Sequence, residues 1–209
     1  MTRRGQPDDV EIYGIKRAYD GFFKLDIVDF RYRRHDRAWS RRLTREVFRR
    51  APTAAVLPYD PRRDEVVLVE QMRPPAIDDP AGPWLVEAVA GVIEPGESAE
   101  ALVRREAREE AGLDLGAVEH LFDVLLSPGG STERISLFVG EADTAGAGGL
   151  FGVAAEGEDI RAVVWPADAA LAAIGTKVVT APAILCLQWL ALNRARLHRG
   201  WARAGARPA

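Results

Sequence analysis

The chain has 209 residues, of which 47% are hydrophobic and 28% are charged, and its formal net charge is −3. This composition is typical of an ordinary globular protein, and no apolar run approaches the ~18 residues that a membrane span needs. The N-terminus leads into Asp8 and Asp9 rather than into an apolar core, so no export signal is visible. Cys186 is the only cysteine. No intramolecular disulfide can form, and we expect a cytoplasmic protein without a membrane partner.

The segment up to residue 50 is expected to form a small antiparallel sheet. Its three strands are predicted at 10–13, 22–32 and 43–48. The second strand alternates between apolar and polar residues, which predicts that Phe23, Leu25 and Ile27 face inward, with Val28 or Phe30 as a further inward residue. A sheet of this size is marginal alone, so it needs the rest of the chain or a second copy to pack against.

The remainder of the chain mixes strands with helices. Strands are predicted at 53–59, 65–73, 85–90, 121–126, 134–140 and 159–165. Helices are predicted at 98–111, at 166–174 and from about 181 to 199, and the small residues of 145–157 are expected to form a loop. This pattern indicates an α/β protein with α/β/α layering. We divide it into an N-terminal segment, 1–50, and a main domain, 51–209.

One stretch, from Gly91 to Leu113, combines a turn with a helix. Pro95-Gly96 is typical of a turn, and Ser98 follows at the position expected of a helix N-cap. Residues 99–111 are mostly Ala, Leu, Arg and Glu, which are strong helix formers. Gly112 stands where a left-handed C-cap is expected.

Three carboxylates of this helix fall on one face. Glu106, Glu109 and Glu110 are three or four residues apart, which places their Cβ atoms roughly 5–6 Å from one another. Like charges so close repel one another, but clustered carboxylate oxygens are what hard divalent cations prefer. Arg105 is expected to reach back to Glu97 and tie the loop to the helix. Glu and Arg content alone would also suit a solvated surface helix.

The loop ahead of the helix decides between these two interpretations. The stretch reads as Gly, five residues, Glu, seven residues, Arg-Glu, two residues, Glu-Glu, one residue, Gly and an aliphatic residue. This pattern resembles the signature of the Nudix hydrolase family. It is filled here by Gly91, Glu97, Arg105, Glu106, Glu109, Glu110, Gly112 and Leu113. Ala107 is smaller than the aliphatic residue that is more usual there.

Further segments are similar to the bacterial ADP-ribose pyrophosphatase branch of that family. They are Asp20-Gly21-Phe22-Phe23, Arg45-Glu46-Val47-Phe48, Ser127-Pro128-Gly129-Gly130 with Glu133-Arg134, and Glu156-Gly157-Glu158-Asp159-Ile160-Arg161. The likeness extends from about residue 10 to residue 189. Asp20, Ala155 and Gly157 depart from it, and these departures question substrate fit more than catalysis.

The resemblance implies a Nudix α/β/α sandwich with a mixed sheet, plus an N-terminal antiparallel three-stranded sheet used in dimerisation and exchanged across a homodimer. It implies two or three Mg²⁺ ions, or Mn²⁺, held by Glu106, Glu109, Glu110, Glu158 and the backbone carbonyl of Ala90. Glu156 would be the general base that deprotonates the attacking water.

The resemblance also assigns the substrate contacts. Phe22 and Phe23 correspond to adenine-stacking positions, and Arg45, Glu46 and Arg50 would contact the nucleotide. Arg73 would hold a phosphate. Contacts on the side of the terminal ribose are expected from Val92, Ser127, Pro128, Gly129 and Glu133. The loop framework would be Gly91, Glu97, Arg105 and Gly112. The expected reaction converts ADP-ribose to AMP and ribose 5-phosphate.

Three alternatives differ from this reading. The substrate can be another nucleoside diphosphate sugar such as GDP-mannose, because the same core binds any diphosphate. The chain can be a nucleotide sensor with a degenerate site, although the complete set of signature residues argues against it. The nine arginines between residues 31 and 50 can indicate RNA binding and a capped RNA substrate, or the solvated side of strands. We expect no nucleic acid partner.

Overall fold

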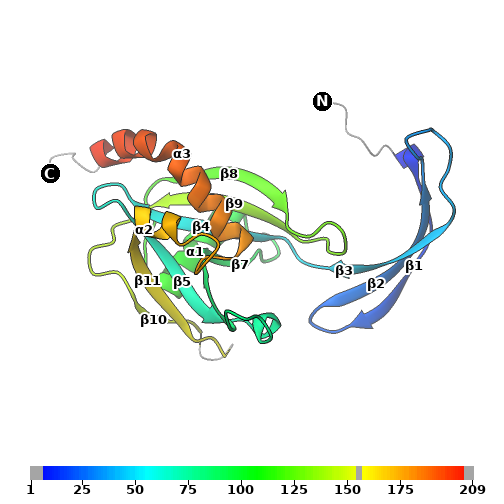
Figure 1. Ribbon diagram of the computed structural model, residues 1–209, viewed down its shortest axis with the longest axis horizontal. Coiled ribbons are helices and arrows are strands. Elements are labelled where there is room, and N and C mark those ends of the chain that lie inside the picture. Colours follow the sequence, from blue (N-terminus) through cyan, green and yellow to red (C-terminus); the bar gives the residue numbers. More distant parts are fainter. Residues whose placement is uncertain (1–6, 154–156, 205–209) are drawn as a thin grey trace. The chain divides into compact units, whose positions relative to one another are not determined.

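Figure 1 shows a computed structural model of the chain, in which residues 7–153 and 157–204 are described. The chain divides into two compact units. The N-terminal unit comprises residues 1–51 and 125–134, and the main unit comprises 52–124 and 135–209. Among the described residues, no helix is long and apolar enough to cross a membrane.

The N-terminal unit is built on a three-stranded antiparallel sheet, which confirms the predicted architecture. Its strands are β1 (Val10–Asp20), β2 (Lys24–Tyr32) and β3 (Leu43–Arg49), in the order β1-β2-β3, and a short 3-10 turn, η1 (Pro7–Asp9), precedes them. The first strand is longer than predicted. It continues to Asp20 because β2 offers hydrogen-bonding partners along its whole length.

The alternation predicted for β2 is confirmed at Val28 and wrong at Phe23, while Leu25 and Ile27 are half-buried. Asp26 and Val28 are buried, whereas Phe23 is 38% exposed. Burial of a carboxylate requires compensating charge. Arg17 and Arg49 provide it, since each donates from its Nε to the Asp26 carboxylate, over 2.8 Å from Arg49. These hydrogen bonds, first that of Arg17 and then that of Arg49, lower the pKa of Asp26 despite its burial.

Segment 125–134 pairs with the end of β3 although it is distant in sequence. The Phe48 amide donates to the Gly130 carbonyl over 2.8 Å, and the Thr132 amide donates back to the Phe48 carbonyl over 2.9 Å. This pairing makes segment 125–134 part of the N-terminal unit. Nothing in the residue pattern indicated it.

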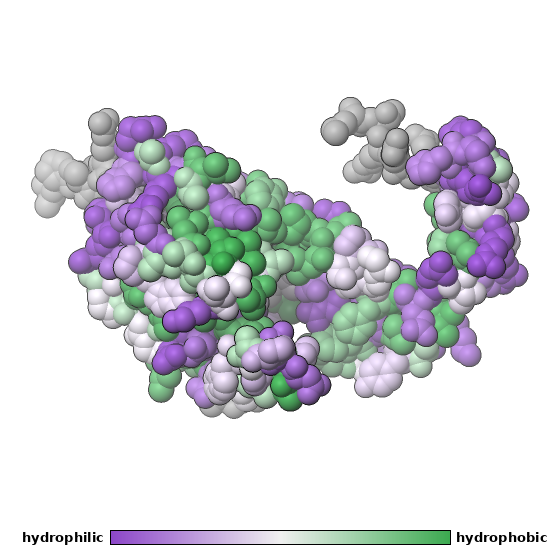
Figure 2. All heavy atoms as spheres, viewed as in Figure 1, coloured by the Kyte–Doolittle hydropathy of each residue, from purple (hydrophilic) through white to green (hydrophobic). Residues whose placement is uncertain are grey.

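Strand β1 leaves large apolar side chains uncovered. Ile12, Ile15 and Tyr19 are 59%, 55% and 62% exposed. Figure 2 shows hydrophobic and hydrophilic residues side by side on this unit. Exposed apolar side chains on a sheet that is marginal by itself are consistent with a surface made to pack against another chain.

The main unit contains a mixed sheet. Its strands are β4 (Thr53–Asp60), β5 (Glu65–Met72), β6 (Trp84–Glu87), β7 (Val89–Val92), β8 (Val118–Leu125), β9 (Arg134–Glu141), β10 (Gly149–Phe151) and β11 (Ile160–Pro166). The order is β10-β11-β5-β4-β9-β8, with β6 paired to β5 and β7 paired to β4. Strands β4 and β9 run parallel, whereas β4 and β5 are antiparallel. The sheet is therefore mixed, as predicted.

The helices of the main unit are α1 (Ala99–Ala111), α2 (Ala167–Ala172) and α3 (Ala181–Ala204), and a 3-10 turn, η2 (Pro74–Ala76), follows β5. Helices α1 and α3 lie on opposite sides of the sheet (Figure 1). Leu102 and Val103 of α1 pack on Val67 and Val69 of β5. Because side chains alternate along a strand, Leu68 and Glu70 point to the face opposite α1.

Four predicted elements differ from the observed ones. The single strand expected at 85–90 is two strands, because β6 pairs with β5 while β7 pairs with β4, with Ala88 between them. The loop expected at 145–157 contains β10, which pairs with β11. Helix α3 extends to Ala204, beyond the expected end near 199, and Pro166 is the N-cap of α2 rather than its first helical residue.

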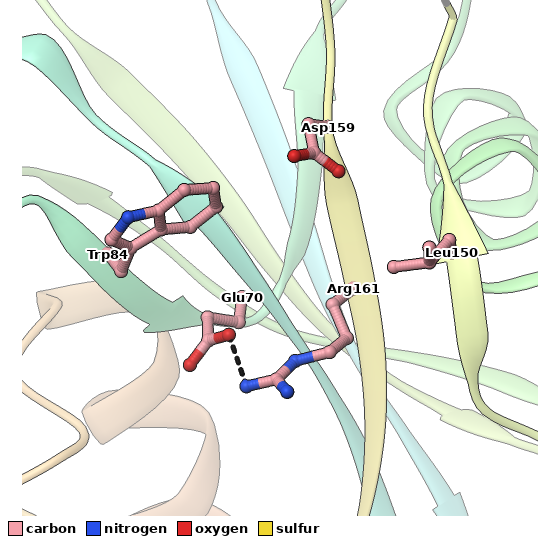
Figure 3. Close-up of a pocket in the computed structure, with 5 residues that line it drawn as sticks. All are labelled: Glu70, Trp84, Leu150, Asp159 and Arg161. Atoms are coloured by element: carbon pink, nitrogen blue, oxygen red, sulfur yellow. Dashed lines mark hydrogen bonds and ion pairs between the residues drawn. The ribbon is translucent and has the colours of Figure 1, made fainter.

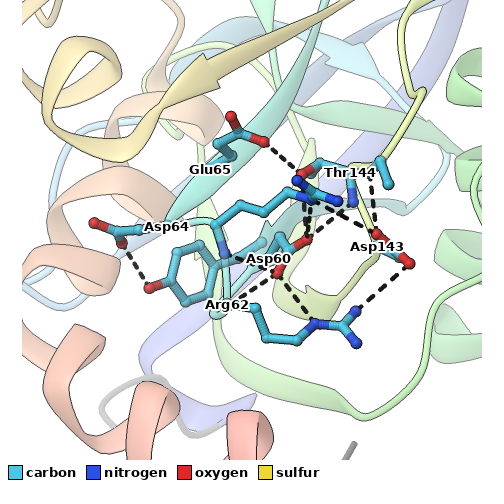
Figure 4. A network of polar contacts seen from close by, with 9 residues as sticks. Asp60, Arg62, Asp64, Glu65, Asp143 and Thr144 are labelled. Carbon is cyan, nitrogen blue, oxygen red and sulfur yellow. Dashed lines mark hydrogen bonds and ion pairs between the residues drawn. The ribbon is translucent and has the colours of Figure 1, made fainter.

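A buried polar network closes the β4–β5 turn (Figure 4). Asp60 is 0% exposed and accepts hydrogen bonds from the amides of Arg62, Arg63 and Thr144, over 2.8, 3.2 and 3.1 Å. The Thr144 hydroxyl adds a fourth bond of 3.2 Å. Burial alone would raise the pKa of Asp60, but these donors outweigh it and lower the pKa.

Candidate active site

Local sequence sets the ends of α1. The Ser98 hydroxyl accepts a hydrogen bond from the Ala101 amide over 3.1 Å, and so caps the first turn. At the other end, Gly112 has φ 65°, in the left-handed region, and its amide bonds to the Arg108 carbonyl over 3.0 Å. The helix boundaries are those that the capping residues predicted.

Gly91 lets the helix approach β7 very closely. A Cβ atom on Gly91 would lie 1.9 Å from Oε1 of Glu106, which is far inside van der Waals contact. Only glycine therefore allows the Glu106 carboxylate to lie against this backbone. Burial raises the pKa of Glu106, partly offset by Arg105.

Glu110 is a buried carboxylate with few partners. It is 4% exposed, and its Oε2 accepts a hydrogen bond from the Ala90 amide over 3.1 Å. Burial is the main reason that its pKa is raised to about 8, with repulsion from Glu106 and Glu158 added. An under-compensated buried carboxylate favours a nearby cation.

Arg105 joins the loop to the helix. Its Nε donates to Glu97 over 3.1 Å, while its Nη1 donates to Glu106 over 2.9 Å and to Glu109 over 2.8 Å. Glu97 in turn accepts from the Glu94 amide over 3.1 Å. The hydrogen bond that Arg105 donates to Glu97 is the largest of the effects that raise the pKa of Arg105. One guanidinium thus balances three clustered carboxylates.

The segment before β11 brings Glu158 to the same site. Its negative charge raises the pKa of both Glu106 and Glu110. Its carboxylate accepts a hydrogen bond from the Val153 amide over 3.0 Å. Glu156, the expected general base, lies outside the described residues. Val92 ends β7 and is 45% exposed.

The donor set fits a hard divalent cation in its chemistry. Carboxylates from α1 and from the segment before β11 offer oxygen atoms, and the buried Glu110 accepts a hydrogen bond from the Ala90 amide. Across 7–153 and 157–204, however, no three His, Cys, Asp or Glu side chains are already arranged to hold a metal ion. Arg105 engages Glu106 and Glu109 instead.

Arg73 follows β5 and is held by a residue that the sequence analysis did not single out. Its Nε donates to Oε2 of Glu87 over 2.7 Å. The positive charge of Arg73 lowers the pKa of Glu110, so Arg73 belongs to the carboxylate site electrostatically. The available signal was a charged residue, Glu87, inside the apolar run 85–90.

In the N-terminal unit, aromatic rings cluster around the predicted adenine-stacking residues. The ring centroids of Phe22 and Phe23 are 4.8 Å apart, and those of Phe23 and Phe48 are 5.0 Å apart. The guanidinium of Arg50 lies 4.6 Å from the Phe23 ring centroid and donates to Glu133 over 3.2 Å. The fold thus brings together Phe23, Arg50 and Glu133, three residues predicted to contact substrate.

The other predicted contacts of this unit lie on its surface. Arg45 and Glu46 are exposed on β3, and Arg45 donates to the Thr44 carbonyl over 2.8 Å. In the loop 127–133, the Gly130 and Ser131 amides donate to the Ser127 carbonyl over 3.2 and 2.9 Å. Pro128 and Gly129 occupy the exposed tip of this turn.

A separate cavity of about 500 Å³ lies on the sheet face opposite α1 (Figure 3). It is lined by Glu70, Trp84, Leu150, Asp159 and Arg161. Figure 3 shows the Glu70–Arg161 ion pair across paired strands, and no predicted site residue lines this cavity. It is therefore distinct from the carboxylate site on the α1 face.

Comparison with known proteins identifies the family of this chain. An ADP-ribose pyrophosphatase of Escherichia coli (strain K12) is 45% identical over 196 residues, covering 93% of this chain and 94% of the relative. A GDP-mannose pyrophosphatase of Cronobacter sakazakii is 34% identical, covering 88% of this chain and 96% of the relative. A crystal structure of an ADP compounds hydrolase covers 99% of this chain and 100% of its own, with TM-score 0.67 and 18% identity, and so shares the fold. A NUDIX domain model matches residues 49–181. This chain, whose helix α1 carries the signature residues Arg105, Glu106, Glu109 and Glu110, belongs to the Nudix family.

Proposed function

We propose that the chain hydrolyses the diphosphate bond of ADP-ribose to give AMP and ribose 5-phosphate, in a reaction that depends on a divalent metal. The observation that carries the proposal is the placement of Glu106 and Glu110 against the Gly91 backbone and the Ala90 amide. Its substrate is supported by the E. coli relative named ADP-ribose pyrophosphatase, which is similar over 93% of this chain.

Mg²⁺, or Mn²⁺, is the proposed metal, with two or three ions in each site. Glu106, Glu109, Glu110, Glu158 and the Ala90 carbonyl would hold it. Bound there, such an ion neutralises phosphate charge and lowers the pKa of a water molecule. Arg105 would release Glu106 and Glu109 on loading while keeping its contact with Glu97, because its Nε and Nη1 serve different partners.

The remaining chemistry belongs to the side chains. Glu156 is proposed to take the proton of the attacking water as the general base. Arg73 holds a phosphate, since a planar guanidinium matches two phosphate oxygens. Ten residues are proposed to contact the base and the sugars of the substrate: Phe22, Phe23, Arg45, Glu46, Arg50, Val92, Ser127, Pro128, Gly129 and Glu133.

A homodimer is proposed for the same enzyme, with residues 1–50 as a dimerisation and substrate-binding segment and 51–209 as the hydrolase domain. The exposed apolar side chains of β1 support it, because a partner would remove them from water. In an exchanged dimer, the N-terminal sheet of one protomer would complete the site of the other. A cytoplasmic location goes with the single, buried Cys186.

A substrate panel tests the proposal. Purified protein with Mg²⁺ is given ADP-ribose, GDP-mannose and other diphosphate-linked nucleotides, and the products are identified. We expect AMP and ribose 5-phosphate from ADP-ribose, with the highest kcat/KM in the panel. A higher value for GDP-mannose would replace the substrate but keep the reaction class. Inactivity toward every diphosphate would remove the proposal.

A further inference from the structure

Arg73 is fixed in two places. Its backbone amide donates to the Pro83 carbonyl over 2.8 Å, which closes the loop 73–83, and its Nε donates to Glu87 over 2.7 Å. Among the described residues, neither of its terminal nitrogens makes a hydrogen bond. A guanidinium anchored through Nε keeps both terminal nitrogens available for a phosphate.

The register of the sheet places the Arg73–Glu87 pair on the face that α1 covers. Glu87 is directly opposite Val69 in the β5–β6 pairing, and opposed residues project from the same face. Val69 packs in the core against α1, so Glu87 also faces the α1 side. The effect of Arg73 on the pKa of Glu110 agrees with this placement.

We propose that Glu87 is a positioning residue, which orients the Arg73 guanidinium so that its two terminal nitrogens meet the substrate diphosphate. Glu87 is 17% exposed at its side chain, whereas Arg73 is 42% exposed, so the carboxylate is the fixed member of the pair. Without it, the flexible arginine would spread over many rotamers and lose side-chain entropy on binding substrate. The inference rests on the proposed diphosphate hydrolysis.

A second pair in the same sheet provides a matched control. Glu70 bonds to Arg161 on the face opposite α1 (Figure 3), and it does so through a terminal nitrogen of the arginine. In each pair, one residue lies on β5 or directly follows it, and the other lies on a strand that pairs with β5. They differ in the sheet face and in which guanidinium nitrogen is engaged. Only the pair on the α1 face is expected to affect substrate binding.

The experiment compares Glu87→Gln with Glu70→Gln in the full-length protein with Mg²⁺ and ADP-ribose. For Glu87→Gln we expect KM to rise about tenfold, which corresponds to about 1.4 kcal/mol, while kcat changes less than KM. An arginine that holds phosphate equally before and during reaction contributes uniform binding, which appears in KM. For Glu70→Gln we expect wild-type KM and kcat. Equal kinetics for the two variants would overturn the inference.

A double-mutant cycle separates positioning from a structural role. In an Arg73→Lys background, which lacks Nε, Glu87→Gln should add little to KM; a full tenfold rise there would overturn the inference. Glu87→Asp keeps the charge, so its KM should lie between the values of the wild type and of Glu87→Gln. If Glu87→Gln does not fold, Glu87→Asp replaces it in the comparison. Wild-type inactivity on ADP-ribose would instead refute the proposed function. In that case, the same variants are compared on the diphosphate that the wild type does hydrolyse.

Discussion

Glu110 and Asp60 are both buried carboxylates of the main unit, but their surroundings shift their pKa values in opposite directions. Asp60 accepts hydrogen bonds from three backbone amides and a hydroxyl, and its pKa is lowered although burial opposes this. Glu110 accepts one from the Ala90 amide, and burial raises its pKa to about 8.

The difference separates a structural carboxylate from a functional one. The chain satisfies the charge of Asp60 with its own donors and so stabilises a turn (Figure 4). At Glu110 it leaves the charge under-compensated beside two further carboxylates, Glu106 and Glu158. A site that binds a cation requires such a deficit, because a carboxylate already saturated with donors has little to offer a metal.

The largest expected effect comes from Glu110→Gln. The substitution removes a proposed metal ligand, and we expect kcat/KM for ADP-ribose to fall roughly 100-fold or more, because a catalytic metal contributes several kcal/mol. The metal-free protein should melt at the same or a higher temperature at pH 7, since a carboxyl group whose pKa is raised to about 8 in the folded state costs stability there and glutamine removes that cost.

Glu100→Gln is the matched control for this variant. Glu100 lies on the same helix but is exposed, where it pairs with Arg104 over 2.9 Å. Its substitution should leave turnover unchanged. Wild-type kcat/KM in Glu110→Gln, measured beside this control, would show that Glu110 holds no essential metal.

The opposite outcome is expected for Asp60→Asn. An amide cannot accept all four hydrogen bonds, so some buried donors lose their partner, and the free energy of unfolding should fall by about 2–3 kcal/mol. Turnover at a temperature where the variant is folded should stay at the wild-type value. Urea unfolding tests the loss of stability, and kcat/KM measured on the same preparation tests the unchanged turnover. A loss of turnover without a loss of stability would contradict the structural role of Asp60.

The sequence predicted α1 to within one residue, because its signals are local. Ser98 and Gly112 mark the ends of the helix through their own backbone and side-chain preferences. The common face of Glu106 and Glu110 follows from helical spacing alone. The layered α/β architecture and the three-stranded sheet were also predicted, because the hydrophobic periodicity of each segment can be recognised without knowing which segment it packs against.

Features that depend on distant partners were missed. The Arg73–Glu87 pair requires the register between β5 and β6. Strand β10 forms from a glycine-rich segment because β11 offers it hydrogen bonds. Asp26 is buried only because two arginines from neighbouring strands neutralise it. A single residue pattern contains none of this information.

A smaller effect on activity is expected from Gly91→Ala. The added methyl group would force Glu106 away from β7, and misplacement of a catalytic group should lower kcat/KM roughly tenfold. The comparison is Gly200→Ala in α3, where a Cβ meets nothing within 4 Å and turnover should not change. If Gly91→Ala keeps full activity, the close approach of Glu106 to this backbone is not required for catalysis.

The smallest expected effect is the contribution of Asp60 to acid sensitivity. Its pKa in the folded state lies below the ordinary value of 3.8, so the folded state binds fewer protons than the unfolded state as that range is entered. The stabilisation is therefore fully present above about pH 5 and is lost as the pH falls through the lowered pKa.

The unfolding free energies of wild type and Asp60→Asn should differ by a constant amount from pH 7 to pH 5. Below about pH 5 the difference should shrink as Asp60 is protonated, first in the unfolded chain and then, at its lowered pKa, in the folded protein. Urea unfolding at a series of pH values measures it, and a difference that stays constant down to pH 2 would show that hydrogen bonding to the charged form of Asp60 is not what stabilises the turn.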